Sequence, residues 1–214
     1  MNALARRTKL ATCALAVTAQ VAVAQSPSPR ATQTGLSRDE VIALSVLPLP
    51  EQLRAGATVD SLDDRGRPIE LRKATNGMVC VRMVPGEAEW DARCYHESFI
   101  PLFFRRGELR RQGLKEAEAT LRMNEAVRTG ALPPPPRPTA GYRILGSAAA
   151  YDPKTGKSTA ELSAWQSIHM PFQTAADLGL PDEATLTPGQ RDWMPFVMAG
   201  GTWWSHVMIK HPGH

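Results

Sequence analysis

The sequence predicts an α+β protein in which antiparallel β-hairpins surround a helical segment in the middle of the chain, with one disulfide. Residues 58–84 hold three runs of strand-forming residues separated by turn signals rich in Asp, Asn and Gly. Residues 99–129 then place apolar side chains at helical spacing. Cys80 and Cys94 supply the pair for the disulfide. Together these three observations favour hairpins, a helical insert and a covalent link.

The N-terminus predicts export. Residues 1–24 begin with Arg6, Arg7 and Lys9 and continue as an apolar run without acidic residues that ends at Ala22-Val23-Ala24. This is the anatomy of a secretory signal peptide, with cleavage near Ala24. We therefore expect a periplasmic or secreted protein with a flexible Ser/Pro/Thr-rich leader over 25–36. The twin-arginine route and the general route both stay open.

Cleavage changes the charge balance and the cysteine count. The signal peptide carries three of the 25 basic residues and no acidic ones, so the mature chain has a net charge of +1. This near-neutral balance predicts no nucleic-acid partner. No other stretch is long and apolar enough to predict a transmembrane segment.

Cys13 leaves with the signal peptide, so Cys80 and Cys94 remain as an even pair. In an oxidising compartment such a pair predicts a disulfide, with free thiols or a metal pair as alternatives. The loop that it closes spans 15 residues, for which the chain-entropy model gives about 3 kcal/mol. The spacing is not CxxC, so a redox-active dithiol is not expected.

The first predicted elements are two short helices. Ser37 and Glu40 form the two ends of a capping box, which predicts a helix that ends near Pro48. A second helical turn is expected at 50–54, closed by Gly56.

Three strands follow, at 58–62, 68–73 and 78–84. Turn formers at 63–66 and at Asn76-Gly77 separate them, which predicts a three-stranded antiparallel meander. A type I′ turn at Asn76-Gly77 would pair Thr75 with Met78.

Two helices are predicted in the middle of the chain. In the first, Pro101 opens the first turn, and the apolar side is formed by Phe99, Leu102, Phe103 and Leu109. In the second, over 115–129, we expect Ala117, Leu121 and Ala126 to face inward. Four basic residues lie on the first helix, where they form either a contact for an anionic envelope surface or a solvated helix face. They are Arg105, Arg106, Arg110 and Arg111.

A proline-rich stretch at 133–138 predicts an extended spacer. It separates an N-terminal α+β half, 37–132, from a β-rich C-terminal half, 139–214, and we expect the two halves to pack as one domain. A hairpin turn is expected at 152–157 and a final strand at 203–209. On that strand Trp203 and Trp204 would point to opposite faces.

Familiar catalytic motifs are missing from the sequence. His96-Glu97 would begin an HExxH zinc site, but Ile100 stands where the second histidine is needed. The chain has no GxSxG elbow, no GxGxxG loop and no EF-hand loop. A triad assembled in space remains an open alternative. Its members would come from Ser205, His169, His206, Asp177 and Asp192.

Two groups of residues are candidates for a functional site. Trp165, Trp203 and Trp204 could form a platform for a sugar ring or an apolar ligand, with core packing as the alternative. Imidazole and thioether groups could hold copper or zinc, since soft ligands suit copper in an exported protein. The candidate ligands are His96, His169, His206 and Met208. Apart from this alternative, no cofactor is predicted.

Three short blocks carry a resemblance to known sequences. They are Ala57-Thr58-Val59, the stretch Thr75-Asn76-Gly77-Met78-Val79-Cys80, and Ser205-His206-Val207-Met208-Ile209. In these blocks the chain resembles a group of uncharacterised exported bacterial proteins, and this resemblance implies export without implying an activity. We therefore expect an exported protein that binds a small molecule, a glycan or an envelope partner without catalysis. A metal-binding protein or metal-dependent enzyme is the alternative.

Overall fold

The structure is a computed structural model of the chain. It describes residues 36–63, 65–83, 89–147, 151–152, 157–158 and 163–211. The predicted signal peptide, its cleavage position, the leader up to residue 35 and the centre of the turn at 152–157 lie outside these residues. Within them, no helix has the length and the apolar character needed to cross a lipid bilayer.

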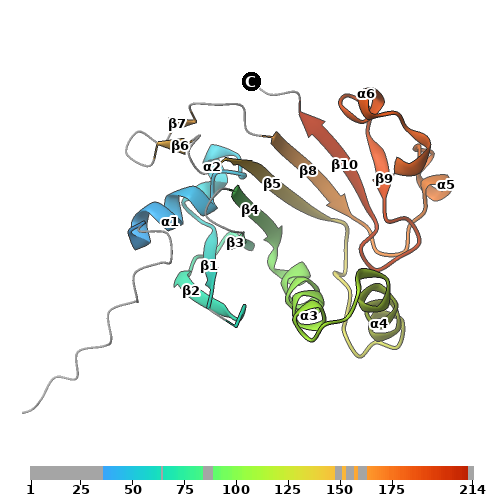
Figure 1. The fold of residues 1–214 in the computed structure, drawn as a ribbon, viewed down its shortest axis with the longest axis horizontal. Coiled ribbons are helices and arrows are strands. Elements are labelled where there is room, and N and C mark those ends of the chain that lie inside the picture. Colours follow the sequence, from blue (N-terminus) through green and yellow to red (C-terminus); the bar gives the residue numbers. More distant parts are fainter. Residues whose placement is uncertain are drawn as a thin grey trace, which may run out of the picture. The chain divides into compact units, whose positions relative to one another are not determined.

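In the described part of the chain, eight strands form one sheet in the order β2-β1-β3-β4-β5-β8-β10-β9 (Figure 1). Every neighbouring pair is antiparallel except β1 and β3. With the helices that pack on this sheet, the α+β class is confirmed. The strands are β1 Thr58–Leu62, β2 Pro68–Arg72, β3 Met78–Met83, β4 Glu89–His96, β5 Thr139–Ser147, β8 Ser163–His169, β9 Phe196–Met198 and β10 His206–His211, and β6 Tyr151–Asp152 pairs separately with β7 Lys157–Ser158.

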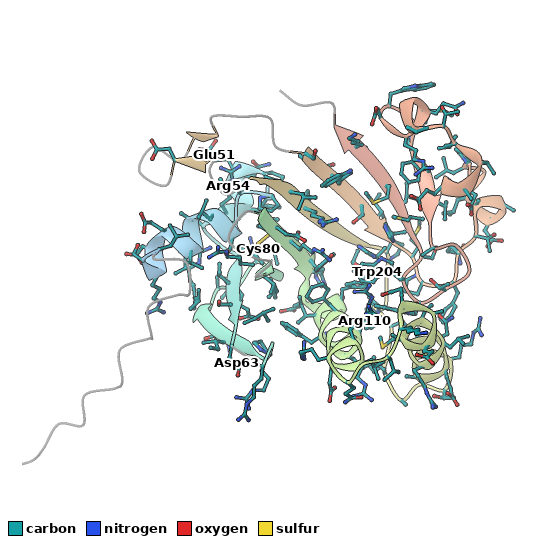
Figure 2. The ribbon with its side chains drawn as sticks, viewed as in Figure 1. Glu51, Arg54, Asp63, Cys80, Arg110 and Trp204 are labelled. Carbon is teal, nitrogen blue, oxygen red and sulfur yellow. A yellow bond between two sulfur atoms is a disulfide. The ribbon has the colours of Figure 1, made fainter. Side chains whose placement is uncertain are left out.

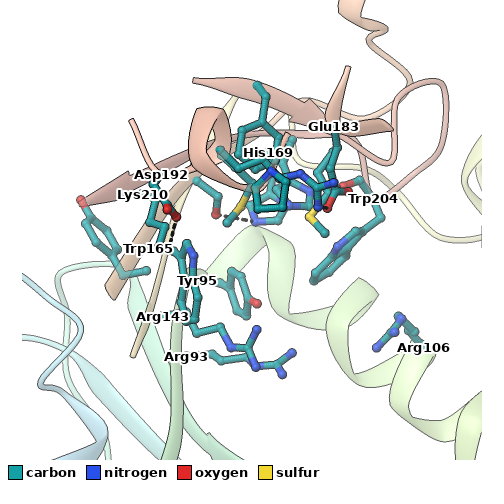
Figure 3. A pocket seen from close by; sticks show the side chains of 18 residues that line it. Arg93, Tyr95, Arg106, Arg143, Trp165, His169, Glu183, Asp192, Trp204 and Lys210 are labelled. Atoms are coloured by element: carbon teal, nitrogen blue, oxygen red, sulfur yellow. Dashed lines mark hydrogen bonds and ion pairs between the residues drawn. The ribbon is translucent and has the colours of Figure 1, made fainter. Parts of the chain in front are cut away.

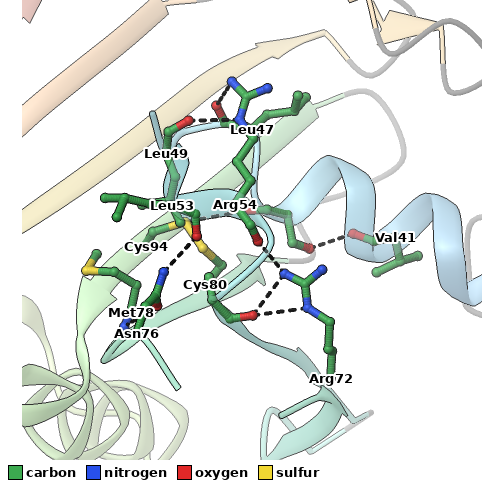
Figure 4. Close-up of a disulfide and its surroundings, with 12 residues drawn as sticks. Val41, Leu47, Leu49, Leu53, Arg54, Arg72, Asn76, Met78, Cys80 and Cys94 are labelled. Carbon is green, nitrogen blue, oxygen red and sulfur yellow. Dashed lines mark hydrogen bonds between the residues drawn. A yellow bond between two sulfur atoms is a disulfide. The ribbon is translucent and has the colours of Figure 1, made fainter. Parts of the chain in front are cut away.

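The predicted hairpin at Asn76-Gly77 is wrong, because β2 and β3 do not pair. β3 instead runs parallel to β1 on the side away from β2, with Val59 opposite Cys80. The reason is the Asn76 side chain, which donates to the Leu53 carbonyl oxygen and accepts from the Met78 N–H (Figure 4). These bonds dock the turn onto the segment before β1, so it cannot fold β3 back onto β2.

Most of the described helices are short, and side chains cap the starts of α1, α5 and α6 but not those of α2 and α3. The capping box at Ser37 and Glu40 is confirmed at the start of α1. The described helices are α1 Arg38–Ser45, α2 Glu51–Arg54, the 3-10 turn η1 Glu97–Phe99, α3 Ile100–Arg111, α4 Glu116–Arg128, α5 Ala175–Leu178, the 3-10 turn η3 Glu183–Thr185 and α6 Pro188–Arg191.

The predicted disulfide between Cys80 and Cys94 is confirmed. The two cysteines lie directly opposite each other on β3 and β4, and both are fully buried (Figure 4). They belong to an apolar cluster with Val41 of α1 and Val59 of β1. The bond therefore links neighbouring strands under α1, on one face of the sheet.

The opposite face of the same strands is covered by α3 and α4. The inward face predicted for α3 is confirmed, since Leu102, Phe103 and Leu109 are buried. The face predicted for α4 is wrong, since Leu121 is 68% exposed. The buried face of α4 is formed instead by three residues spaced one helical turn apart, Ala119, Met123 and Val127. The reason is that these three residues share one apolar cluster with the buried side chains of α3.

Most of the basic residues of α3 are paired with glutamates. Figure 2 labels one of these basic residues, Arg110. Arg105 is bonded to Glu108 of the same helix, while Arg106 and Arg110 both lie near Glu116 of α4. Contact with an anionic envelope surface through these residues stays a prediction.

Strands from both sides of the proline-rich stretch lie in one sheet, because β4 pairs with β5 from Glu89 to Tyr95. The final strand begins at His206 and not at Trp203 as predicted. Trp203 and Trp204 lie in a turn instead, with ring centroids 4.9 Å apart. Positive φ angles at Ala199 and Gly201 bend the chain just before them, and Asn124 of α4 accepts the Trp203 N–H at 2.8 Å. The two tryptophans are therefore neighbours and do not point to opposite faces of a strand.

Candidate functional site

A cavity of about 560 Å³ opens on the sheet face beyond the area that α3 and α4 cover (Figure 3). Its floor is formed by β4, β5, β8, β10 and β9, and its sides by α3, by Trp204 and by residues 183–192. A volume of this size is typical of a small-molecule site. The strand register arranges the floor in three parallel rows of side chains, which can be followed across the sheet.

The first row carries charge and a tryptophan, and the second is apolar or small. The first row is Arg93, Arg143, Trp165 and Lys210. The second row is Tyr95, Gly141, Ser167, Met208 and Phe196. The third row is Thr139, His169, His206 and Met198. The cavity floor thus changes from cationic at one edge to apolar and imidazole-lined at the other.

Asp91 holds the two arginines of the first row together. Its carboxylate accepts bonds from Arg93 Nη2 at 2.6 Å and from Arg143 Nη2 at 2.9 Å, and the Nε atoms of both arginines donate to its other oxygen at 3.0 Å. Burial raises the pKa of Asp91, but the bonds from Arg93 and Arg143 outweigh burial, so its pKa lies below the usual value. One carboxylate is thereby shared by two cations.

Aromatic rings stand on two sides of this cluster. The Arg143 guanidinium lies 5.3 Å from the centre of the Trp165 ring, which is its cross-strand neighbour on β8. On the other side, Arg106 of α3 lies 5.7 Å from the centre of the Trp204 ring. Figure 3 shows Trp165 and Trp204 on opposite sides of Tyr95. Both tryptophans are partly exposed and can contact a ligand.

Gly141 makes room for the side chains around the second row. A Cβ at this position would lie 2.5 Å from Ser167 Oγ, 2.9 Å from His169 Nε2 and 3.0 Å from Tyr95 Cδ1. Real Cβ atoms essentially never approach other atoms so closely, so any larger residue would displace these three groups. The glycine therefore lets Tyr95, Ser167 and His169 meet over the centre of the sheet.

The third row holds two buried imidazoles with ring centroids 4.8 Å apart. Burial, and then the charge of neighbouring His206, lowers the pKa of His169 well below its usual value. Burial also lowers the pKa of His206, although its bond to the Trp204 carbonyl oxygen opposes that change. Both rings are therefore neutral at pH 7.

The hydrogen bonds in this region do not build a catalytic triad among the described residues. The Ser205 hydroxyl donates to the Gln173 carbonyl oxygen, and Asp177 caps α5. Ser167 Oγ does lie 3.1 Å from His169 Nε2, the separation of a nucleophile and its base. However, His169 Nδ1 has no partner within the described part of the chain. An imidazole with a lowered pKa and no orienting acceptor is a weak base.

The structure brings together only part of the predicted metal set. His169, His206 and Met208 line the cavity. His96 does not, because Tyr95 points into the cavity and the next residue of a strand points to the other face. Its Nδ1 lies 2.9 Å from Ser98 Oγ at the start of η1. Across the described residues, no three His, Cys, Asp or Glu side chains come close enough to hold a metal ion.

The predicted tryptophan platform is likewise divided. Trp165 and Trp204 line the cavity, whereas Trp203 is 1% exposed and packs in the core against Phe99. Sequence reasoning did not single out Asp91 or the two arginines that it holds. A signal for Asp91 and Arg93 was present, because their alternation with Tyr95 along one strand places all three on one face. Arg143 lies on a different strand, β5.

Comparison of the chain with protein-family models, with curated proteins and with solved structures found no significant match.

Proposed function

We propose that this is an exported, non-catalytic binding protein whose cavity takes a small organic molecule with a flat apolar part. One observation carries the proposal: two partly exposed tryptophans, Trp165 and Trp204, border a cavity of about 560 Å³ that also holds fixed polar groups. Concave sites with aromatic walls and a few placed polar groups are the usual form of small-molecule sites.

Two further observations favour binding without chemistry. The imidazoles in the cavity are buried and neutral, and Ser167 lies beside a base, His169, that has no orienting acceptor among the described residues. The export part of the proposal rests on the N-terminal sequence. The buried disulfide between Cys80 and Cys94 supports it, because such bonds persist in oxidising compartments.

The test is a thermal-shift and tryptophan-fluorescence screen of small aromatic and sugar compounds against the wild-type chain. Compounds that raise the melting temperature are then measured with Trp204→Leu, which removes one wall of the cavity. Trp193→Leu is the matched control, because Trp193 is 70% exposed and lies outside the cavity lining. We expect Trp204→Leu to weaken binding and Trp193→Leu to leave it unchanged. Equal binding by both variants would refute a ligand site in this cavity.

A second candidate function, binding of a soft metal ion, is favoured by the residues around His206. Met198 is the cross-strand partner of His206 on β9, and Met208 lies two residues further along β10 on the same face. The Nδ1 atom of His206 is 2.6 Å from the Trp204 carbonyl oxygen. Metal-binding histidines usually donate their other nitrogen in this way, and two thioethers with one imidazole suit copper(I).

Silver(I) tests this candidate without a reductant, so the disulfide stays intact. The wild-type chain should bind one equivalent in chloride-free buffer, and the double substitution Met198→Leu, Met208→Leu should abolish binding. Leucine nearly preserves side-chain volume, so the cavity should keep its shape. His96→Gln is the control for binding elsewhere. Retention of binding by the double variant would exclude the thioether site.

A further inference from the structure

The cavity carries an excess of positive charge at one place on its floor. Lys210 is paired with Asp192, and Arg191 with Glu183, so these cations are balanced one to one. The two arginines of the first row share a single carboxylate, that of Asp91. Within the described residues, this cluster therefore keeps one positive charge without a counterpart.

Arg143 is the more exposed of the two cluster arginines that line the cavity. Its side chain is 36% exposed, compared with 18% for Arg93 and 7% for Asp91. Its Nε and Nη2 atoms donate to Asp91. Its Nη1 atom makes no hydrogen bond to any of the residues that the structure describes. Arg143 thus has donors to spare for a ligand in the cavity.

The guanidinium of Arg143 is also held in place before any ligand arrives. Asp91 fixes one edge by two bonds, and the ring of Trp165 lies against it. A donor that is already ordered loses little conformational freedom on binding, so more of the interaction energy appears as affinity. A planar guanidinium fixed in this way suits a carboxylate, which it can bind through paired donors.

The floor next to Arg143 consists of apolar or small residues. Gly141 lies two residues before Arg143 on the same face of β5, and the side chains of Tyr95 and Ser167 close over it. Beyond it the second row continues through Met208. A ligand with its charged group on Arg143 would therefore place its body over this second row and near the ring of Trp204.

From this arrangement we infer that the cavity selects an organic monoanion: a carboxylate attached to a flat apolar body, with the carboxylate on Arg143. The inference rests on the proposed function, and it names the ligand class of the same site. Arg106 at the side of the cavity is bonded to Glu116, so the unbalanced positive charge on the floor is the one beside Arg143. It matches a carboxylate and favours such an anion over a neutral sugar.

The experiment compares acids with their amides, which have nearly the same shape. Phenylacetate and phenylacetamide, indole-3-acetate and indole-3-acetamide, and the neutral sugar maltose are titrated into the full chain by calorimetry at low salt. We expect each acid to bind at least about tenfold more tightly than its amide, because a charge-assisted bond is stronger than a neutral one. Arg143→Gln should remove this preference, because the affinity for the acid should fall to about that for its amide. Arg122→Gln, an exposed change outside the cavity, should alter neither.

Equal affinity for acid and amide in the wild-type chain overturns the inference and leaves the proposed function standing. The same conclusion follows if maltose binds and the aryl compounds do not, or if Arg143→Gln keeps the preference. Failure of every compound to bind overturns both the inference and the proposed function.

If Arg143→Gln does not fold, the salt dependence of binding to the wild-type chain tests the inference. Raising NaCl to about 0.5 M should weaken binding of the acids and not of the amides, because added salt screens charge, and equal salt dependence refutes the inference.

Discussion

Gly141→Ala should destabilise the fold at the centre of the cavity floor. The added Cβ would lie 2.5 Å from Ser167 Oγ, 2.9 Å from His169 Nε2 and 3.0 Å from Tyr95 Cδ1. The serine hydroxyl can rotate away, but His169 and Tyr95 are buried and packed against Phe99, so they can move little. Overpacking of this kind costs about 1–3 kcal/mol. For a chain of this size, a loss of about 2 kcal/mol lowers the melting temperature by roughly 4–8 °C.

Urea unfolding followed by tryptophan fluorescence measures this effect. Gly189→Ala is the matched control, since no atom lies within 4 Å of a Cβ there, and it should stay within about 0.5 kcal/mol of the wild type. The double substitution Gly141→Ala, Ser167→Ala removes the closest contact and should recover part of the loss. If Gly141→Ala is as stable as the control, or if the double variant recovers nothing, the close packing around Gly141 is refuted.

Three further predictions concern the covalent link, the buried imidazoles and the arginine cluster. Replacing both Cys80 and Cys94 by alanine should lower the free energy of unfolding by about 3 kcal/mol, because the unfolded chain loses a 15-residue loop constraint. Ligand binding, measured by calorimetry well below the melting temperature, should persist. Loss of binding in a folded variant would contradict a purely structural role for the disulfide. Folding lowers the pKa of His169, so the unfolded chain binds more protons than the folded chain below about pH 6.5. The free energy of unfolding should therefore fall as the pH drops from 7 to 5.5, and His169→Gln should flatten this dependence. An identical slope in the variant would contradict the role given to His169. Asp91→Asn leaves Arg93 and Arg143 without their shared carboxylate and should lower the free energy of unfolding, measured in urea, by about 3 kcal/mol. A change below about 0.5 kcal/mol would show that this carboxylate does not stabilise the fold.

Local sequence signals predicted the elements whose causes are local. The capping box at Ser37 and Glu40 sets the start of α1 through bonds between residues three apart. The apolar spacing in α3 likewise identified the buried face of that helix. The cysteine pair was predictable because only two cysteines follow the predicted signal peptide.

Local signals failed where a distant partner changed the outcome. Asn76-Gly77 is a strong hairpin signal by itself, but the Asn76 side chain bonds to Leu53, which lies 23 residues earlier. The inward face of α4 depends on which of its stripes meets α3, and the sequence of α4 alone holds two such stripes. Trp203 and Trp204 lie in a turn that is anchored to Asn124 of α4.

The candidate site divides in the same way. By itself the sequence identified Trp165, Trp204, His169 and His206 as candidate site residues. An indole ring can stack on a ligand and an imidazole nitrogen can bind a metal ion wherever the residue lies in the fold. Only the tertiary structure decided which of them meet, since register across five strands places them on one face together with residues that no motif marks. Asp91 and Arg143 are 52 positions apart, and their bond exists because β4 pairs with β5. The chemistry of a side chain follows from the identity of that residue alone. A cavity and its excess charge arise only when folding brings several strands together.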